Sequence, residues 1–161
     1  MNARLICKLI GATLVTDQLT KAAALTLLSQ GKTVAVFPGL NLTLGFNEGA
    51  SFGMFSDLMA GKPLLMAALT GTLTVVLAFM AFRARHPVER VGFSLIVGGA
   101  LGNVNDRLRQ GAVTDFLDLA WRDWRFPTFN GADIAITLGA LCILFASVAS
   151  HRREVSGVDQ S

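Results

Sequence analysis

Residues 63–82 read "PLLMAALTGTLTVVLAFMAF", an apolar run of twenty residues that lies between Lys62 and Arg83 and contains no charge. As an α-helix this run measures about 30 Å, which matches the hydrocarbon thickness of a bilayer. The whole chain is 52% hydrophobic and only 16% charged, whereas soluble domains carry about 25% charged residues. The sequence therefore predicts an α-helical integral membrane protein, folded as a single domain over residues 1–161.

Three further apolar stretches lead us to predict four transmembrane helices, with both chain ends on one side of the membrane. Residues 134–150 contain no charge, and residues 91–105 form a shorter uncharged run. The first stretch is the weakest because Lys8, Asp17 and Lys21 interrupt it, and a cleaved signal peptide is the alternative there. The predicted spans are residues 4–24, 62–83, 88–106 and 131–150, with connections at 25–61 and 107–130 and a disordered tail at 152–161.

The basic residues alone do not orient the chain, since seven Lys and Arg lie on each side of the predicted membrane. On the side of the termini they are concentrated in the loop "RARHPVER" (83–90) and the tail "HRRE" (151–154). That side also carries only three acids, against eight on the other. We therefore expect both termini in the cytoplasm and the two long connections outside it.

Composition argues against several other functions. The net charge of +3 is small and the basic residues form no long stripe, so we expect no nucleic-acid binding. Cys7 and Cys142 lie far apart in apolar runs, which indicates neither a disulfide framework nor a metal site.

The two outer connections have different patterns. In the first, Leu40, Leu42, Leu44 and Phe46 alternate with polar or small residues, which predicts a strand in a small extracytoplasmic β-sheet. The second, over residues 107–129, places Trp121 and Trp124 among charged residues and predicts an interfacial helix or loop.

Polar residues at the membrane edge gather on the outer side, which indicates one site at the outer boundary. Each has a local alternative: Asp17 and Lys21 could form a helix-surface ion pair, and Asn130 could cap a helix with Asp133 at its third position. Gly98 and Gly102 predict close helix packing. The gathered polar residues are Asp17, Lys21, Asn47, Asn103, Arg107, Asp115, Asn130 and Asp133.

Two of these acids, Asp115 and Asp133, predict a particular chemistry. Pro127 and the Asn130-Gly131 pair break the chain between them, so that it can fold back and bring the two carboxyl groups together. Adjacent carboxyl groups share a proton, and such a pair can activate water while protonating a scissile carbonyl. Both histidines are assigned to the other side of the membrane, so no Ser-His or Cys-His pair competes.

The segments "DQLTK" (17–21), "FNEGASFG" (46–53), "GGALGNVNDRLRQGAVTDF" (98–116) and "FNGAD" (129–133) resemble, in order and spacing, the motifs of bacterial lipoprotein signal peptidase, signal peptidase II. The resemblance implies an aspartic endopeptidase of the inner membrane that removes the signal peptide from prolipoproteins, before a diacylglyceryl-modified cysteine. It implies no metal or other cofactor, contact with membrane lipid, and inhibition by globomycin-type peptides. The implied catalytic pair is Asp115 and Asp133, with supporting or substrate-binding roles for Asp17, Lys21, Asn47, Gly49, Asn103, Arg107 and Asn130.

Two alternatives belong to other classes. A small transporter or channel would need polar residues along a path through several spans, whereas the cytoplasmic halves of the last three predicted spans are nearly all apolar. A prepilin-type or presenilin-like protease would carry a Gly-x-Gly-Asp motif, which this chain lacks.

Overall fold

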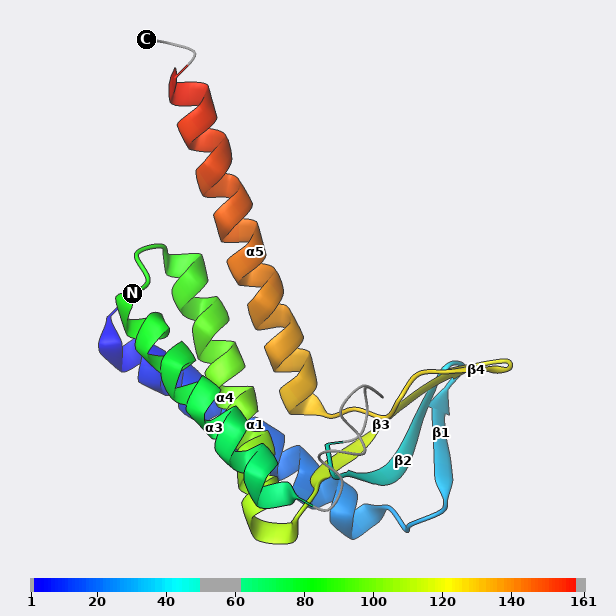
Figure 1. The fold of residues 1–161 in the computed structure, drawn as a ribbon. Coiled ribbons are helices and arrows are strands. Elements are labelled where there is room, and N and C mark those ends of the chain that lie inside the picture. The colour runs from blue at the N-terminus through cyan, green and yellow to red at the C-terminus, as the bar shows by residue number, and fades with distance from the viewer. Residues whose placement is uncertain (1, 50–61, 159–161) are drawn as a thin grey trace.

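A computed structural model describes residues 2–49 and 62–158 of the chain. The helices lie side by side, and the strands form a sheet at the end of the helices away from both chain termini (Figure 1). In order, the described elements are α1 (Ala3–Leu27), β1 (Thr33–Phe37), β2 (Leu40–Asn47), α3 (Pro63–Arg83), α4 (Pro87–Gln110), β3 (Val113–Trp121), β4 (Trp124–Arg125) and α5 (Gly131–Val158).

Helices occupy all four segments that the sequence predicts as spans, and local signals set their ends. The Asn2 side chain caps α1 by accepting a hydrogen bond from the Leu5 N–H at 3.0 Å. Proline is the first residue of both α3 and α4, where its missing N–H leaves no donor unsatisfied. Helix α4 continues to Gln110, so that Arg107 belongs to the helix and not to the connection that follows it.

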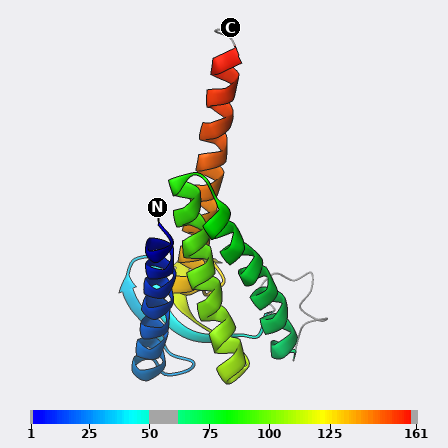
Figure 2. The same cartoon turned by 90° about the vertical axis from the view of Figure 1, so that its left-hand side faces the viewer.

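Helix α4 is the centre of the helical part and packs against α1, α3 and α5. Figure 2 shows it between α1 and α3, with α5 behind. Gly98 and Gly102 face α1, where an added Cβ at Gly98 would lie 2.6 Å from the Cβ of Thr13. The close packing that we predicted for these two glycines is confirmed, because only a residue without a side chain lets the helices approach so closely.

The outer surfaces of α3 and α5 are apolar, with many large exposed side chains, among them Leu73, Phe79 and Leu144. By length and composition, two helices in the described residues could cross a membrane, Pro63–Arg83 and Gly131–Ser150. Helices α1 and α4 carry most of the polar side chains described below, and their crossing of a membrane stays a prediction.

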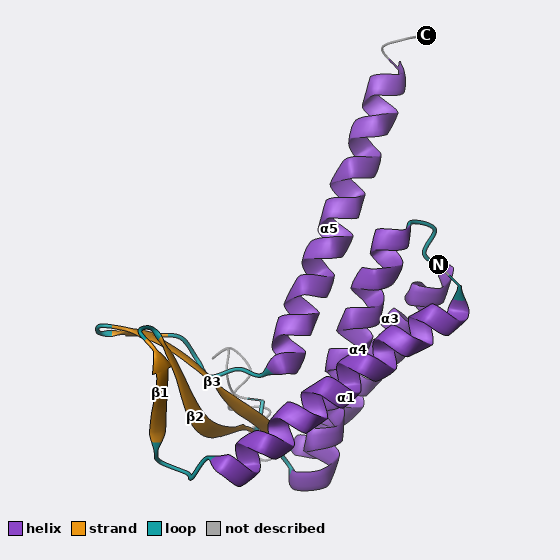
Figure 3. Cartoon of the chain, turned by 180° about the vertical axis from the view of Figure 1, so that it is seen from behind, coloured by secondary structure: helices purple, strands orange, loops and turns teal. Residues whose placement is uncertain are grey.

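The four strands form one antiparallel sheet in the order β1-β2-β3-β4, seen from behind in Figure 3. Strands β1 and β2 are joined by the Pro38-Gly39 turn. Strand β2 contains the alternating residues 40–46, which we predicted as a strand. Its partner β3 comes from the second connection, with Leu40 opposite Leu119 and Gly45 opposite Asp115. The sheet therefore joins two segments that are about 70 residues apart along the chain.

Two sequence-based expectations need correction. We expected an interfacial helix or loop over residues 107–129, but Val113–Trp121 is a strand, because its Val, Phe and Trp residues favour strands and β2 supplies its backbone partners. We also expected a disordered tail over residues 152–161, but α5 continues into it as far as Val158, since no proline interrupts the helix, and residues 159–161 lie outside the described residues. Residues 50–61, part of the first predicted connection, lie outside the described residues.

The contact between α4 and α5 depends on two facing glycines, and this generates a stability prediction. An added Cβ at Gly92 would lie 2.6 Å from the Gly139 carbonyl oxygen, whereas one at Gly71 on α3 would meet nothing within 4 Å. We expect Gly92→Ala to destabilise the fold by about 1–3 kcal/mol through overpacking. Gly71→Ala should be neutral or stabilising, because alanine favours a helix by about 1 kcal/mol. Thermal unfolding in detergent measures the stability of both variants. Equal melting temperatures for Gly92→Ala and Gly71→Ala would contradict the close contact between α4 and α5.

Candidate active site

A buried ammonium group holds α1 against α4 at the end of the helices nearest the sheet. The Lys21 Nζ lies 2.9 Å from Asp17 Oδ2 on its own helix and 2.8 Å from Asp106 Oδ2 on α4. It also donates to Asn103 Oδ1 at 2.8 Å. Lysine has three N–H donors, and here three acceptors surround it. All of Asp17, Lys21 and Asp106 are buried, so the sequence-predicted helix pair is a buried ion cluster instead of a surface one.

Asp106 connects this cluster to the start of β3. Its Oδ2 accepts a hydrogen bond from the Thr114 backbone N–H at 3.1 Å, and its Oδ1 accepts one from Gln18 Nε2 at 3.0 Å. Asp115 is the next residue along β3. The acid on α4 therefore fixes the backbone immediately before one of the two predicted catalytic residues.

The same cluster reaches the start of α5. Asp17 Oδ1 accepts a hydrogen bond from the Ala132 backbone N–H at 2.9 Å. Asn103 accepts from Lys21 and donates its Nδ2 to Asp133 Oδ1 at 3.1 Å. The side-chain amide of Asn103 thus links Lys21 to Asp133. Polar contacts join α1, α4 and α5 in this region.

Asn130 joins the two predicted catalytic acids. Its backbone N–H donates to Asp133 Oδ2 and its Oδ1 accepts from the Asp133 backbone N–H, both at 3.1 Å. This reciprocal pair is a capping box, and it confirms the cap that we considered as the local alternative for Asp133. The Asn130 Nδ2 also donates to Asp115 Oδ1 at 2.6 Å. The fold-back across Pro127 has therefore brought both acids to one asparagine.

Asp115 is buried in β3, where its electrostatics differ from those of an ordinary carboxyl group. Burial raises the pKa of Asp115 from its usual 3.8 to about 6, and repulsion by Asp133 acts in the same direction. Hydrogen bonds from Asn130 and Asn47 and the charge of Lys21 act against this increase. A carboxyl group with a pKa near 6 can both hold and release a proton near neutral pH.

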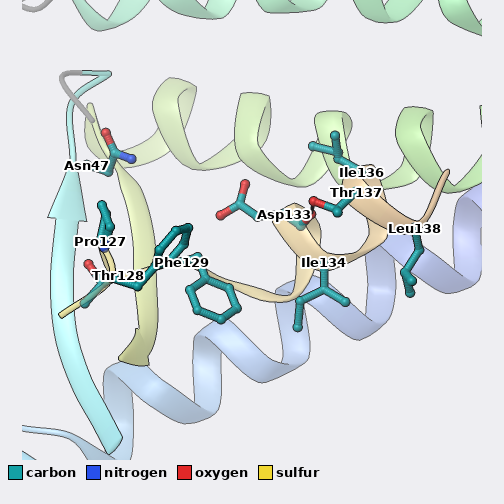
Figure 4. Close-up of a pocket in the computed structure, with 10 residues that line it drawn as sticks. Asn47, Pro127, Thr128, Phe129, Asp133, Ile134, Ile136, Thr137 and Leu138 are labelled. Atoms are coloured by element: carbon teal, nitrogen blue, oxygen red, sulfur yellow. Dashed lines mark hydrogen bonds between the residues drawn. The ribbon is translucent and has the colours of Figure 1, made fainter. Parts of the chain in front are cut away.

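Two adjoining pockets open beside the acids. The larger, of about 600 Å³, is lined by Asp133 and by mainly apolar side chains of α5 and of residues 126–129. Figure 4 shows the Asp133 carboxylate directed away from α5, toward the side of the pocket where Asn47, Pro127 and Thr128 lie. The second pocket, of about 470 Å³, is lined by Asp115. Asn47, Pro127 and Thr128 line both pockets, so the pockets adjoin each other, with Asp133 in the lining of one and Asp115 in the lining of the other.

Asn47 and Gly49 belong to a tight turn. The Gly49 backbone N–H donates to Asn47 Oδ1 at 2.8 Å. Gly49 has a φ of +109°, a conformation that residues with side chains rarely adopt. The turn places Asn47 at the end of β2, opposite Val113 and close to Asp115.

Arg107 differs from the other predicted residues because it is buried without a complete set of partners. Its guanidinium is close enough to Asp115, Asp133 and Asp106 to interact electrostatically with all three. Its Nε, however, makes no hydrogen bond within the described residues. The guanidinium is thus close to both acids and still has a donor to offer.

All nine residues that the sequence singled out lie in this region, but sequence reasoning missed two members of the cluster. Asp106 binds Lys21, Gln18 binds Asp17, and Asp106 and Gln18 bind each other. A signal for Asp106 was available, since it follows Asn103 by three residues and shares its helix face. Gln18 lies one residue from Asp17 and gave no such signal.

The described residues contain no group of three or more His, Cys, Asp or Glu side chains placed to hold a metal ion. Two carboxyl groups bound to one amide, one of them with a raised pKa, suit general acid–base chemistry on a polar bond. The apolar pocket beside them suits a hydrophobic ligand.

The buried ion cluster generates a stability prediction. Replacing Lys21 by methionine leaves Asp17 and Asp106 buried without their cation, and breaking such a buried pair costs about 3–5 kcal/mol. We expect Lys21→Met to unfold at a much lower temperature than the wild type in detergent. Lys8→Met is the matched control, because Lys8 lies exposed on the same helix. A Lys21→Met protein as stable as the Lys8→Met protein would show that the cluster does not hold the helices.

The raised pKa of Asp115 generates a prediction about pH. Burial favours the neutral form of the Asp115 carboxyl group. Its contribution to the stability of the fold is therefore complete below pH 3.8 and is lost as the pH rises through about 6. Asp115→Asn lacks the titration. We therefore expect its melting temperature to exceed that of the wild type by more at about pH 8 than at about pH 4. The exposed Asp123→Asn variant should show no such trend, and a pH-independent difference for Asp115→Asn would refute the assignment.

Comparisons with known proteins identify relatives of this chain. A family model described as signal peptidase (SPase) II matches residues 9–149. The lipoprotein signal peptidase of Hydrogenovibrio crunogenus is 36% identical over 155 residues, which cover 92% of this chain and 89% of the relative. That of Cronobacter sakazakii is 38% identical over 150 residues, with 92% and 91% covered. That of Coxiella burnetii is 40% identical over 130 residues, with 80% of each chain covered.

Two solved structures, both described as bacterial membrane enzymes, share the fold. They match with TM-scores of 0.80 and 0.77, each at 30% identity. The matches cover 92% and 89% of this chain, and 90% and 92% of the solved chains. The family that the sequence motifs suggested is thus confirmed by sequence and by fold. The chain belongs to the signal peptidase II family, whose curated members are lipoprotein signal peptidases.

Proposed function

We propose that this chain is an aspartic endopeptidase that removes the signal peptide from prolipoproteins, cleaving before the diacylglyceryl-modified cysteine. Its relatives are named lipoprotein signal peptidases, and its fold is shared with bacterial membrane enzymes. The observation that carries the proposal is that Asp115 and Asp133, from a strand and a helix, both bind Asn130 and each line one of two adjoining pockets.

In the proposed reaction the two acids share one proton and act on a water molecule between them. Asp115 holds the proton, because its pKa is already raised and a bound apolar substrate would exclude water further. The oxygen of the water molecule attacks the scissile carbonyl carbon while Asp133 accepts a proton from that water. At the same time Asp115 donates its proton to the carbonyl oxygen. Asp133 then gives its proton to the departing amine, while Asp115 recovers a proton from the collapsing diol. The carbon–nitrogen bond breaks and both acids return to their starting states.

Neighbouring side chains hold the acids in place. Asn103 and Asn130 donate to the carboxyl groups and fix their orientation. Asp17 and Lys21 support the site from α1 through Asn103 and Ala132. We assign substrate-binding roles to two further groups: Arg107, whose Nε could donate to a substrate carbonyl, and the Asn47–Gly49 turn beside the pockets.

The proposed position in the membrane follows from the arrangement of polar and apolar side chains. All four helices would span the bacterial inner membrane as one integral domain, with the apolar surfaces of α3 and α5 facing lipid. The sheet and site lie at the end of the helices away from the termini. With both termini in the cytoplasm, the site is near the outer leaflet, where water can reach the acids.

The substrate class fits the two pockets. A prolipoprotein presents an apolar signal helix, a lipid-modified cysteine and a polar mature chain at the membrane surface. The larger pocket is lined by Phe126, Phe129, Ile134 and Leu138, which suit the apolar parts of this substrate. Globomycin-type peptides, which we expect to inhibit the enzyme, would compete for the same site.

The dyad assignment generates the central activity prediction. Asp115→Asn and Asp133→Asn should each reduce cleavage of a diacylglyceryl-modified precursor by at least about a thousandfold, since each removes an essential proton carrier. Both proteins should still accumulate in membranes. The measurement is a purified assay that separates precursor from product on a gel, with the unmodified precursor as a substrate control.

Asp123→Asn is the matched protein control, because this acid is exposed in the turn between β3 and β4 and lines neither pocket. It should cleave at the wild-type rate. Near-normal cleavage by either dyad variant would overturn the aspartic mechanism. Failure of the wild type to cleave the modified precursor would overturn the proposed function itself.

A further inference from the structure

The smaller pocket, on the Asp115 side, has a second acidic residue, Glu48, in its lining. It is lined by the end of β2 and by Pro127 and Thr128, with Glu48 at its edge. Among the described residues that line it, none is Lys or Arg. The two cations that act on Asp115, Lys21 and Arg107, belong to the helices and line neither pocket. A chain segment passing through this pocket therefore meets the charge of Glu48, and no cation among the described lining residues compensates it.

The backbone holds Glu48 at this edge. Asn47 is paired with Val113 in the sheet and accepts the hydrogen bond from the Gly49 N–H, so that Glu48 occupies the tip of a closed turn. Gly49 packs close to Met66 of α3, where an added Cβ would lie 3.1 Å from the methionine Cε. The Glu48 residue itself is exposed. Its backbone is thus anchored on both sides, while its carboxylate makes no hydrogen bond or ion pair within the part of the chain that the structure describes.

The two pockets differ in chemistry, which orients a substrate that lies across both acids. The larger pocket is apolar and continues along α5, the direction of the hydrocarbon, so it suits the signal-peptide side. The smaller pocket adjoins the sheet, outside the helices, and has Gly45, Asn47 and Thr128 in its lining. It suits the polar chain that follows the cleavage site. In an extended chain each residue advances by about 3.3 Å, so the first residues after the cysteine would pass Glu48.

We propose that Glu48 is a specificity-determining residue, which favours basic and disfavours acidic side chains at the two positions following the cleavage-site cysteine. This inference rests on the proposed function. Exposed charge pairs contribute modestly and are screened by salt. The expected selectivity is therefore about fivefold in kcat/KM between a lysine and a glutamate substrate, mainly through KM, because a rim charge acts on binding.

The test uses three diacylglyceryl-modified precursors that differ only at those two positions, with Lys, Gln or Glu. The wild type should prefer them in the order Lys, Gln, Glu, and the preference should shrink at high salt. Glu48→Gln should largely remove the preference and Glu48→Lys should reverse it. Asp123→Asn, which removes a charge of the same sign from the exposed β3–β4 turn, should keep the wild-type order.

Each outcome distinguishes this inference from the proposed function. Equal cleavage of the three precursors by the wild type, or an unchanged preference in both Glu48 variants, overturns the role of Glu48 and leaves the peptidase intact. Cleavage of none of them by the wild type overturns both. Melting temperatures of the Glu48 variants should match that of the wild type, because the residue is exposed, and this confirms that any change in selectivity is not a folding defect.

Discussion

The buried contact between Lys21 and its two carboxylates is the interaction on which the rest of the site depends. Removing charges from water is expensive, and it is tolerated only where the geometry is good and the remaining donors are used. Here Asp17 and Asp106 neutralise the cation, and each also accepts a backbone N–H, from the start of α5 and from β3 respectively. One ion cluster therefore fixes the relative positions of the elements that carry the two acids.

The arrangement of polarity follows from the same constraint. Large apolar side chains cover the outside of α3 and α5, while charged groups are buried between α1 and α4. That distribution suits a protein surrounded by lipid, where polar groups find partners only inside the protein or at the water boundary. Burial also raises the pKa of Asp115, which prepares this carboxyl group for proton transfer.

Structural and functional explanations of a residue are compatible here. Asp133 completes the capping box of α5 with Asn130, as a purely structural account would have it. The same cap fixes its carboxylate beside a pocket and leaves Asn130 able to bind Asp115. The cap thus positions both proposed catalytic groups, and its presence does not argue against catalysis. Such sharing explains how a short chain builds a site from few side chains.

From the sequence alone we could predict the helices, the strand at residues 40–46, the close packing at Gly98 and Gly102, and the family, because hydropathy, residue size and motif spacing are local properties. Other features appear only in the folded protein: residues 113–121 pair with β2, Asp106 joins α1 to β3, and two unlike pockets adjoin each other beside the acids. These features depend on contacts between distant parts of the chain, which no local pattern encodes. The burial of Asp115 and its raised pKa are likewise properties of the packed protein.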